Sequence, residues 1–291
     1  MTTEHNDYGA RALEEIARIS RITTAGKQTG KVIMVTGRGG TGKSTFTALA
    51  SQYLKAPRLL LDIDPDQSLA SMLGVDLDSI RIKTEIGREV PVRTLSDLTA
   101  DIVDEDALLE LAGGNLQVKL PLLLQWYTQY RSAQFDLVSL GPKWTEGDYR
   151  AANFLFEFIV PYVGSNYASI IIDSPAGLEH LNRKVVSSVN DLFVVVDPSA
   201  KSLKHVERVK RITREVGIKY DHLYLVGNHE FDDEAERLFV ASGEAFLGRV
   251  DYDPAVREYN LKGKSLWELP PASPACTAVR KILGKAGYEV I

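Results

Sequence analysis

Eight consecutive residues near the start of the chain combine glycines with a lysine and a hydroxyl: Gly37-Arg38-Gly39-Gly40-Thr41-Gly42-Lys43-Ser44. Glycine-rich backbone can turn its N–H groups toward a phosphate chain at the start of a helix. An apolar strand, Val32 to Thr36, precedes the run, and the helix-forming residues 44 to 53 follow it. A P-loop requires this order, whereas a chance glycine-rich turn does not. We therefore predict a phosphate-binding loop.

The residue types within this loop predict which side chain would bind phosphate and which would bind metal. Lys43 would hold the β- and γ-phosphates of a nucleotide, and the hydroxyl of Ser44 would bind Mg²⁺. The remaining nucleotide-binding positions of the loop are Gly37, Gly39, Gly40, Thr41, Gly42 and Thr45. The expected ligands are ATP and Mg²⁺, and the expected chemistry is ATP hydrolysis with Lys43 among the catalytic groups.

Acidic residues follow two further apolar strands. Asp62-Ile63-Asp64-Pro65-Asp66 ends one strand, and Asp173 ends the strand Ser169 to Ile172. The carboxyl ends of parallel strands meet beside a P-loop at one edge of the sheet. Asp173 has the form of a Walker B acid, which holds Mg²⁺ through water, although a strand-ending turn without function is the alternative. For Asp64 the alternative is a helix N-cap, and Asp62 and Asp66 are expected to face solvent or to cap a helix.

Arg38 stands directly after the first glycine, where its guanidinium could bind phosphate oxygens or remain in solvent. With this cation, the loop resembles the deviant P-loop of the MinD/ParA and nitrogenase iron protein class, which has lysine at this position. In that class the extra cation crosses to the nucleotide of the partner subunit. The resemblance implies a homodimer with nucleotide sandwiched at its interface and a catalytic part for Arg38. Arginine in place of lysine leaves the geometry of the contact open.

The same resemblance implies roles for four residues outside the loop. Asp64 matches the switch I aspartate, which positions or activates the attacking water. Gly177, in the stretch Asp173 to Gly177, resembles switch II and could approach the γ-phosphate through its backbone N–H. Asn228 and Asp253 match adenine-side positions, with ordinary turn residues as the alternative. A guanine-reading Asn-Lys-x-Asp motif would need an aspartate three residues after Asn228, where the chain has Phe231, so ATP is favoured.

Further stretches are similar to the CooC-type ATPases, accessory proteins that help insert nickel into carbon monoxide dehydrogenase. The likeness covers residues 32 to 285. It rests on Ala176-Gly177-Leu178-Glu179-His180-Leu181, on Val194-Val195-Val196-Asp197-Pro198 with Ser202, on Val226-Gly227-Asn228 and on Gly263-Lys264-Ser265-Leu266.

The chain departs from this family at the metal site. The family binds nickel across the dimer through a Cys-x-Cys pair, whereas the corresponding stretch here is Gly147-Asp148-Tyr149-Arg150. One carboxylate beside a cation suits nickel poorly, so we do not expect nickel binding by that route. His180 could bind nickel, although a single histidine is more often structural. The only cysteine, Cys276, excludes a disulfide or a thiolate metal site within one subunit.

The elements that must position these residues follow from the hydrophobic pattern. Strands are expected at residues 59–63, 135–140, 169–172, 192–196 and 222–226, with helices between them such as 202–216. This alternation predicts an α/β fold, the three-layer αβα sandwich of a P-loop NTPase with a mostly parallel, doubly wound sheet. Residues 1–30 are expected to form an N-terminal helical extension with a helix at 8–21. Residues 31–291 would be one ATPase domain with an irregular segment near 75–147, including an acidic helix at 98–111.

Composition narrows the class of partner. The chain has 291 residues, 44% hydrophobic and 25% charged, with a net charge of -5, which does not favour general binding to nucleic acid. No apolar run reaches the roughly 20 residues that a membrane-spanning helix needs, and the first thirty residues do not resemble a secretory signal. We therefore expect a cytoplasmic protein without an integral membrane segment and without a nucleic-acid ligand.

Three functions remain open. The first is a maturation ATPase whose nucleotide-driven dimer acts on a metalloprotein client. The second is a positioning or partition ATPase that gathers on membrane or DNA. The tail from Ala278 to Ile291 has only modest amphipathic basic character and is expected to form a closing core helix after a proline-containing loop. The third is a phosphotransferase, for which the sequence shows no acceptor pocket.

Overall fold

A computed structural model describes residues 30–83, 89–91, 94–96, 130–141, 160, 164–176 and 186–290. The expected helices at 8–21 and 98–111 and most of the irregular segment at 75–147 lie outside these residues. Gly177, His180, Asp148 and Arg150 do so as well.

Eight strands of the described chain form one sheet in the order β10-β9-β8-β1-β7-β2-β6-β5. Every neighbouring pair is parallel except β5 with β6. The strands are β1 (Lys31–Gly37), β2 (Arg58–Asp62), β5 (Tyr130–Arg131), β6 (Asp136–Ser139), β7 (Ser169–Asp173), β8 (Ser188–Val196), β9 (Lys219–Gly227) and β10 (Ala245–Arg249). Two further strands, β3 (Arg81–Lys83) and β4 (Glu89–Pro91), form a separate antiparallel pair.

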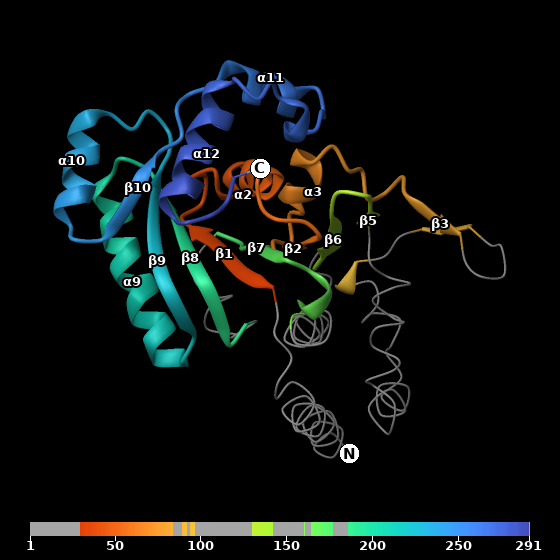
Figure 1. The fold of residues 1–291 in the computed structure, drawn as a ribbon, viewed down its shortest axis with the longest axis horizontal. Helices are drawn as coiled ribbons and strands as arrows, with labels where there is room; N and C mark the ends of the chain where they lie inside the picture. Colours follow the sequence, from red (N-terminus) through yellow and green to blue (C-terminus); the bar gives the residue numbers. More distant parts are fainter. Residues whose placement is uncertain are drawn as a thin grey trace, which may run out of the picture.

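Helices cover both faces of this sheet (Figure 1). They are α2 (Lys43–Gln52), α3 (Ser68–Met72), α9 (Ala200–Val216), α10 (Asp233–Ala241), α11 (Pro254–Leu261) and α12 (Pro274–Lys285), with 3₁₀ turns at Gly164–Asn166 and Leu266–Glu268. Side chains of α9 and α10 pack in one hydrophobic cluster, and those of α2, α3 and α12 pack in a second. The expected three-layer α/β fold is thereby confirmed.

Successive side chains of β1 pack alternately into the two hydrophobic clusters, so the sheet is buried on both faces. Val32 and Met34 belong to the first cluster, whereas Ile33 and Val35 belong to the second. Successive side chains of a strand point to opposite faces, so a strand covered on both sides reads as a continuous apolar run. The strands predicted from such runs are confirmed at β1, β2, β6, β7, β8 and β9, with small shifts at their ends.

The C-terminal part differs from the expectation in its boundaries. Pro274, expected in a loop, is the first residue of α12, which begins four residues before Ala278. Proline is tolerated there because the first turn of a helix has no intrahelical partner for its N–H. Ser273 caps this helix by accepting from the backbone N–H of Cys276 at 3.3 Å. The elements β10, α10 and α11 were not predicted from the sequence.

Strand order sets the geometry of the site. The P-loop follows β1 at the centre of the sheet, with β7 and β2 on one side of it and β8 and β9 on the other. Because these strands are parallel, their carboxyl ends lie at the same edge as the P-loop. None of the helices within the described ranges is long and apolar enough to cross a membrane.

Candidate functional site

At two positions of the P-loop, other chain segments approach so closely that only glycine fits. A Cβ on Gly37 would lie 2.4 Å from the carbonyl oxygen of Val195, and one on Gly42 would lie 2.2 Å from Nδ2 of Asn228. Gly42 also has φ of 84°, which disfavours L side chains, and it is the N-cap of α2. The loop is therefore held against β8 and against the segment after β9.

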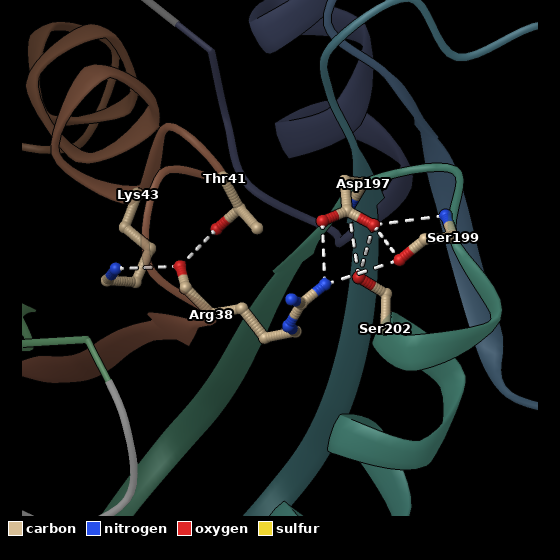
Figure 2. A network of polar contacts seen from close by, with 6 residues as sticks. All are labelled: Arg38, Thr41, Lys43, Asp197, Ser199 and Ser202. Atoms are coloured by element: carbon tan, nitrogen blue, oxygen red, sulfur yellow. Dashed lines mark hydrogen bonds and ion pairs between the residues drawn. The ribbon is translucent and has the colours of Figure 1, made fainter.

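Lys43 is buried inside this loop, with 6% of its surface exposed. Its Nζ donates to the carbonyl oxygen of Arg38 at 3.1 Å, and Thr41 Oγ1 donates to the same oxygen at 2.9 Å (Figure 2). Burial lowers the pKa of Lys43, while the negative charges of Asp173 and Asp64 oppose the shift. The ammonium is thus largely removed from water and close to two carboxyl groups.

Asp173 supplies the buried acid opposite Lys43. Its side chain is fully buried, and Oδ1 accepts from Thr47 Oγ1 at 2.8 Å, while Oδ2 has no hydrogen-bond partner among the described residues. Burial raises the pKa of Asp173 to about 6, against the opposing effects of hydrogen bonds from Ser44 and Thr47 and of the charge of Lys43. An unpaired buried carboxylate oxygen next to a serine hydroxyl offers the hard oxygen donors that Mg²⁺ prefers. The oxygen atoms of Asp173 and Ser44 are therefore suitable ligands for Mg²⁺.

Asp62 takes the capping alternative and not the solvent one. It lies beside Asp173 on the paired strands β2 and β7 and is fully buried. Its carboxylate accepts from the backbone N–H groups of Asp64 and Leu69, both at 3.1 Å, so it ties the turn after β2 to the first turn of α3. Burial and the nearby charge of Asp173 raise the pKa of Asp62 well above its usual value.

Asp64 lies in the turn that Asp62 holds. Its side chain is half-buried, and Oδ1 accepts from the backbone N–H of Asp66 at 3.1 Å. Gln67, and not Asp64, occupies the N-cap position of α3, which argues against the helix-cap alternative. Asp66 is exposed, as expected. The turn leaves Asp64 close enough to Lys43 for the two charges to interact.

Arg38 contacts the segment between β8 and α9. Its Nη1 lies 3.0 Å from Asp197 Oδ2 and 3.3 Å from Ser199 Oγ (Figure 2). Asp197 also accepts from Ser199 N at 3.0 Å and from Ser202 Oγ at 2.8 Å. Partial burial alone would raise the pKa of Asp197, but hydrogen bonds from Ser199 and Ser202 and the charge of Arg38 outweigh it and lower that pKa. The sequence predicted no role for Asp197 beyond the family resemblance of its stretch.

The two positions matched to the adenine side lie in different surroundings. Asn228 donates from Nδ2 to the carbonyl oxygen of Thr41 at 2.9 Å and thus braces the P-loop. Asp253 is buried and is the N-cap of α11, where Oδ1 accepts from Ala255 N at 2.9 Å and Oδ2 from Ala275 N at 3.3 Å. Both its oxygens therefore hold helix ends together. Contact of either residue with adenine stays a prediction.

His205 is a buried neighbour that the sequence did not indicate. It lies on α9 with 7% of its surface exposed, and its Nε2 has no hydrogen-bond partner among the described residues. Burial lowers its pKa, and the positive charges of Arg208, Arg38 and Lys43 lower it further. Positive charges from Arg38 and Lys43 of the P-loop therefore reach this imidazole.

The chain is similar to several proteins along most of its length. It is 27% identical over 263 residues to an uncharacterized ATP-binding protein of Methanocaldococcus jannaschii, covering 87% of this chain and 97% of that protein. It is 23% identical over 258 residues to the carbon monoxide dehydrogenase accessory protein CooC of Rhodospirillum rubrum, covering 82% and 90%.

Among solved structures, the septum site-determining protein MinD of Pyrococcus horikoshii, complexed with Mg-ADP, matches with a TM-score of 0.58 at 22% identity. This match covers 88% of this chain and 96% of that one, and at such identity it shows a shared fold. The model of one family matches residues 32–266, which include the P-loop, the acids after β2 and β7, and Asn228. The chain belongs to the CobQ/CobB/MinD/ParA nucleotide-binding domain family.

Proposed function

We propose that the protein is a dimeric molecular switch that binds Mg-ATP and hydrolyses it. The observation that carries this proposal is the buried pair formed by Lys43, at the start of α2, and Asp173, whose Oδ2 is unpaired among the described residues. A buried ammonium and a buried carboxylate oxygen at the mouth of a P-loop are a matched set for a phosphate chain and its magnesium ion. The family match supports nucleotide binding in general.

In this proposal each group of the site has a separate role. Lys43 exchanges the carbonyl oxygen of Arg38 for β- and γ-phosphate oxygens, and the loop from Gly37 to Gly42 presents backbone N–H groups to them. Ser44 and Asp173 would hold Mg²⁺, which neutralises charge on the phosphates. Asp64 positions the attacking water and accepts its proton as the bond to the γ-phosphorus forms and the bond to ADP breaks.

Dimerisation is the second part of the proposal. Arg38 would exchange its ion pair with Asp197 for phosphate oxygens of the nucleotide in the other subunit, as the resemblance to the deviant P-loop class implies. A guanidinium can bind phosphate through two parallel hydrogen bonds, so arginine can take the place of lysine in such a contact. ATP would then favour the closed dimer, and hydrolysis would favour the open form.

The test uses two site variants and a surface control. Lys43→Ala should lose ATP binding by calorimetry, phosphate release and ATP-dependent dimerisation by light scattering. Asp64→Ala should keep ATP binding and the dimer but lose phosphate release. Lys55→Ala, which changes an exposed lysine, should behave as wild type. Hydrolysis that survives in Lys43→Ala would contradict the proposal, as would wild-type protein that never dimerises with ATP.

For the process that the switch serves, we propose an accessory role in the maturation of a metalloenzyme. The relative that supports it is the carbon monoxide dehydrogenase accessory protein. The stretch that corresponds to the family's Cys-x-Cys pair, Gly147-Asp148-Tyr149-Arg150, has residue types that suit nickel poorly. The role that we propose is therefore action on a client rather than nickel carriage by this chain.

A positioning or partition function is the second candidate. It is supported by structural likeness to the cell division ATPase MinD of Pyrococcus furiosus, with a TM-score of 0.59 and 21% identity. The Asp64→Ala variant, loaded with ATP, separates the two. Recovery of a metalloprotein from native extract, verified by metal analysis and by reconstitution with the purified client, supports the accessory role. ATP-dependent sedimentation with anionic vesicles or retention on DNA supports the alternative.

A further inference from the structure

The turn after β9 contains two consecutive non-glycine residues in the left-handed region. His229 has φ of 59° and Glu230 has φ of 50°, and both side chains are exposed. This conformation costs free energy for any residue with a Cβ, and glycine would adopt it without that cost. Neither side chain is needed to fill the core. Strain of this kind persists where the surrounding structure imposes it and is concentrated at functional sites.

Both ends of this turn are fixed. Asn228 donates from its backbone N to the carbonyl oxygen of Val196 and from Nδ2 to that of Thr41, each at 2.9 Å. At the other end Phe231 is buried and its ring packs so closely on Gly227 that a Cβ there would lie 2.9 Å from it. The backbone between Asn228 and Phe231 is thus held by the P-loop on one side and by the core on the other.

The fixed turn places the imidazole of His229 at the rim of the P-loop. Its Nε2 lies 3.7 Å from the position that a Cβ on Gly42 would take. The ring forms no hydrogen bond, ion pair or aromatic contact with any described residue. An exposed ring held in a strained turn against the N-cap residue of α2 is available to a ligand that enters the loop.

Strand order indicates which end of a nucleotide this ring would meet. The acids proposed to act on metal and water, Asp64 and Asp173, follow β2 and β7 on one side of β1. His229 follows β9, on the other side. When the terminal phosphate and the metal lie toward the acids, the rest of the nucleotide extends from the P-loop toward β8 and β9. His229 therefore lies on the nucleoside side of the site.

Resting on the proposed ATP binding, we propose that the His229 imidazole packs against the ribose and base of the nucleotide and makes the site prefer purine nucleotides. A planar ring gains more contact from a purine than from a pyrimidine. An aromatic contact of this kind corresponds to about a three- to ten-fold change in affinity. The strain at His229 is retained because the ring must be placed beside Gly42.

Calorimetry on the full chain with Mg²⁺ and ATP, CTP or inorganic tripolyphosphate tests this assignment, together with the ligand-free melting temperature. His229→Gly and the matched control Glu230→Gly each remove one strained residue, and both should raise the melting temperature. Only His229→Gly should weaken ATP binding, about three- to ten-fold, and lower the preference for ATP over CTP, with tripolyphosphate binding unchanged. His229→Phe, which keeps a ring, should retain the ATP preference.

Each of the following outcomes would contradict the role assigned to His229. Equal weakening in the two glycine variants would mean that turn rigidity, and not the ring, matters. Equal loss of ATP and tripolyphosphate affinity in His229→Gly would place the imidazole on the phosphates. Wild-type affinity for ATP in every variant would remove His229 from the site while leaving the proposed function intact. Wild-type protein that binds no ATP would overturn both the proposed function and this inference.

Discussion

At the scale of single residues, the site is governed by charges that water cannot screen. Lys43, Asp173 and Asp62 are all buried, and the two carboxyl groups lie side by side on paired strands. Burial disfavours the charged form of each group, which explains why the pKa values of both acids are raised and that of the lysine is lowered. A magnesium ion and a phosphate chain would supply charges that favour ionised acids and a charged lysine.

The raised pKa of Asp173 predicts how stability depends on pH in the protein without metal or nucleotide. Because the native state holds the proton more tightly than the unfolded chain, the cost of ionising Asp173 is absent below about pH 4 and complete above about pH 6. Asp173→Asn cannot ionise at this position, so it should gain stability relative to wild type as pH rises through this window, by up to about 1.4 kcal/mol per pH unit.

Urea unfolding in EDTA at pH 4, 5, 6 and 7 measures this difference. Asp62 acts in the same direction, because removing the charge of Asp173 also lessens the cost of ionising Asp62. Saturating Mg-ATP should reduce the pH dependence of the wild-type protein. A stability difference between variant and wild type that stays constant from pH 4 to pH 7 would show that Asp173 ionises normally.

At the scale of elements, the P-loop is shaped by its neighbours as much as by its own sequence. Gly40 and Gly42 both have positive φ, but a Cβ on Gly40 would meet nothing within 4 Å, whereas one on Gly42 would collide with Asn228. A substitution at Gly40 therefore tests backbone strain alone, whereas one at Gly42 also tests the packing of the turn after β9 against the loop.

We expect Gly42→Ala to weaken ATP binding far more than Gly40→Ala, by at least about ten-fold, because a methyl group at 2.2 Å must displace Asn228 or shift the start of α2. Calorimetric titration of both variants measures the difference. In the Asn228→Ala background, which lacks the colliding amide, Gly42→Ala should cost less affinity than it does in the wild-type protein. Equal losses in the two single variants would show that backbone strain alone matters at Gly42.

At the scale of the whole molecule, one ion pair links the P-loop to the segment between β8 and α9. Arg38 and Asp197 are 159 residues apart in sequence, and their side chains remain 34% and 25% exposed. The proposed dimer requires Arg38 to leave this contact. The ion pair within the chain therefore competes with the contact across the dimer.

Asp197→Asn should shift ATP-dependent dimerisation to lower protein concentration, by about two- to thirty-fold, because the closed dimer breaks two such ion pairs and a partly exposed pair contributes about 0.2 to 1 kcal/mol. Light scattering over a concentration series measures this change. Asp233→Asn, which removes a different arginine partner at the surface, should leave dimerisation unchanged. A dimer that forms equally well in Arg38→Ala would show that Arg38 does not cross between subunits.

The sequence by itself predicted the features that depend only on residues close together along the chain. The P-loop needs only a strand, glycines and a helix in succession, and β1 and α2 lie where that order places them. Continuous apolar runs predicted the buried parallel strands because both faces of each strand are covered. Short or less regular elements were missed: β10 has five residues at the edge of the sheet, and α11 has no buried residues.

The tertiary structure decided which distant groups meet. Only strand order places Asp62 beside Asp173, and only the packing of the turn after β9 brings Asn228 onto the P-loop and His229 to its rim. The pairing of Arg38 with Asp197 and the use of Asp253 as a cap joining α11 to α12 likewise depend on packing. Local spacing determines the type of element that a segment forms, whereas the surroundings of a side chain depend on which elements become neighbours in the folded chain.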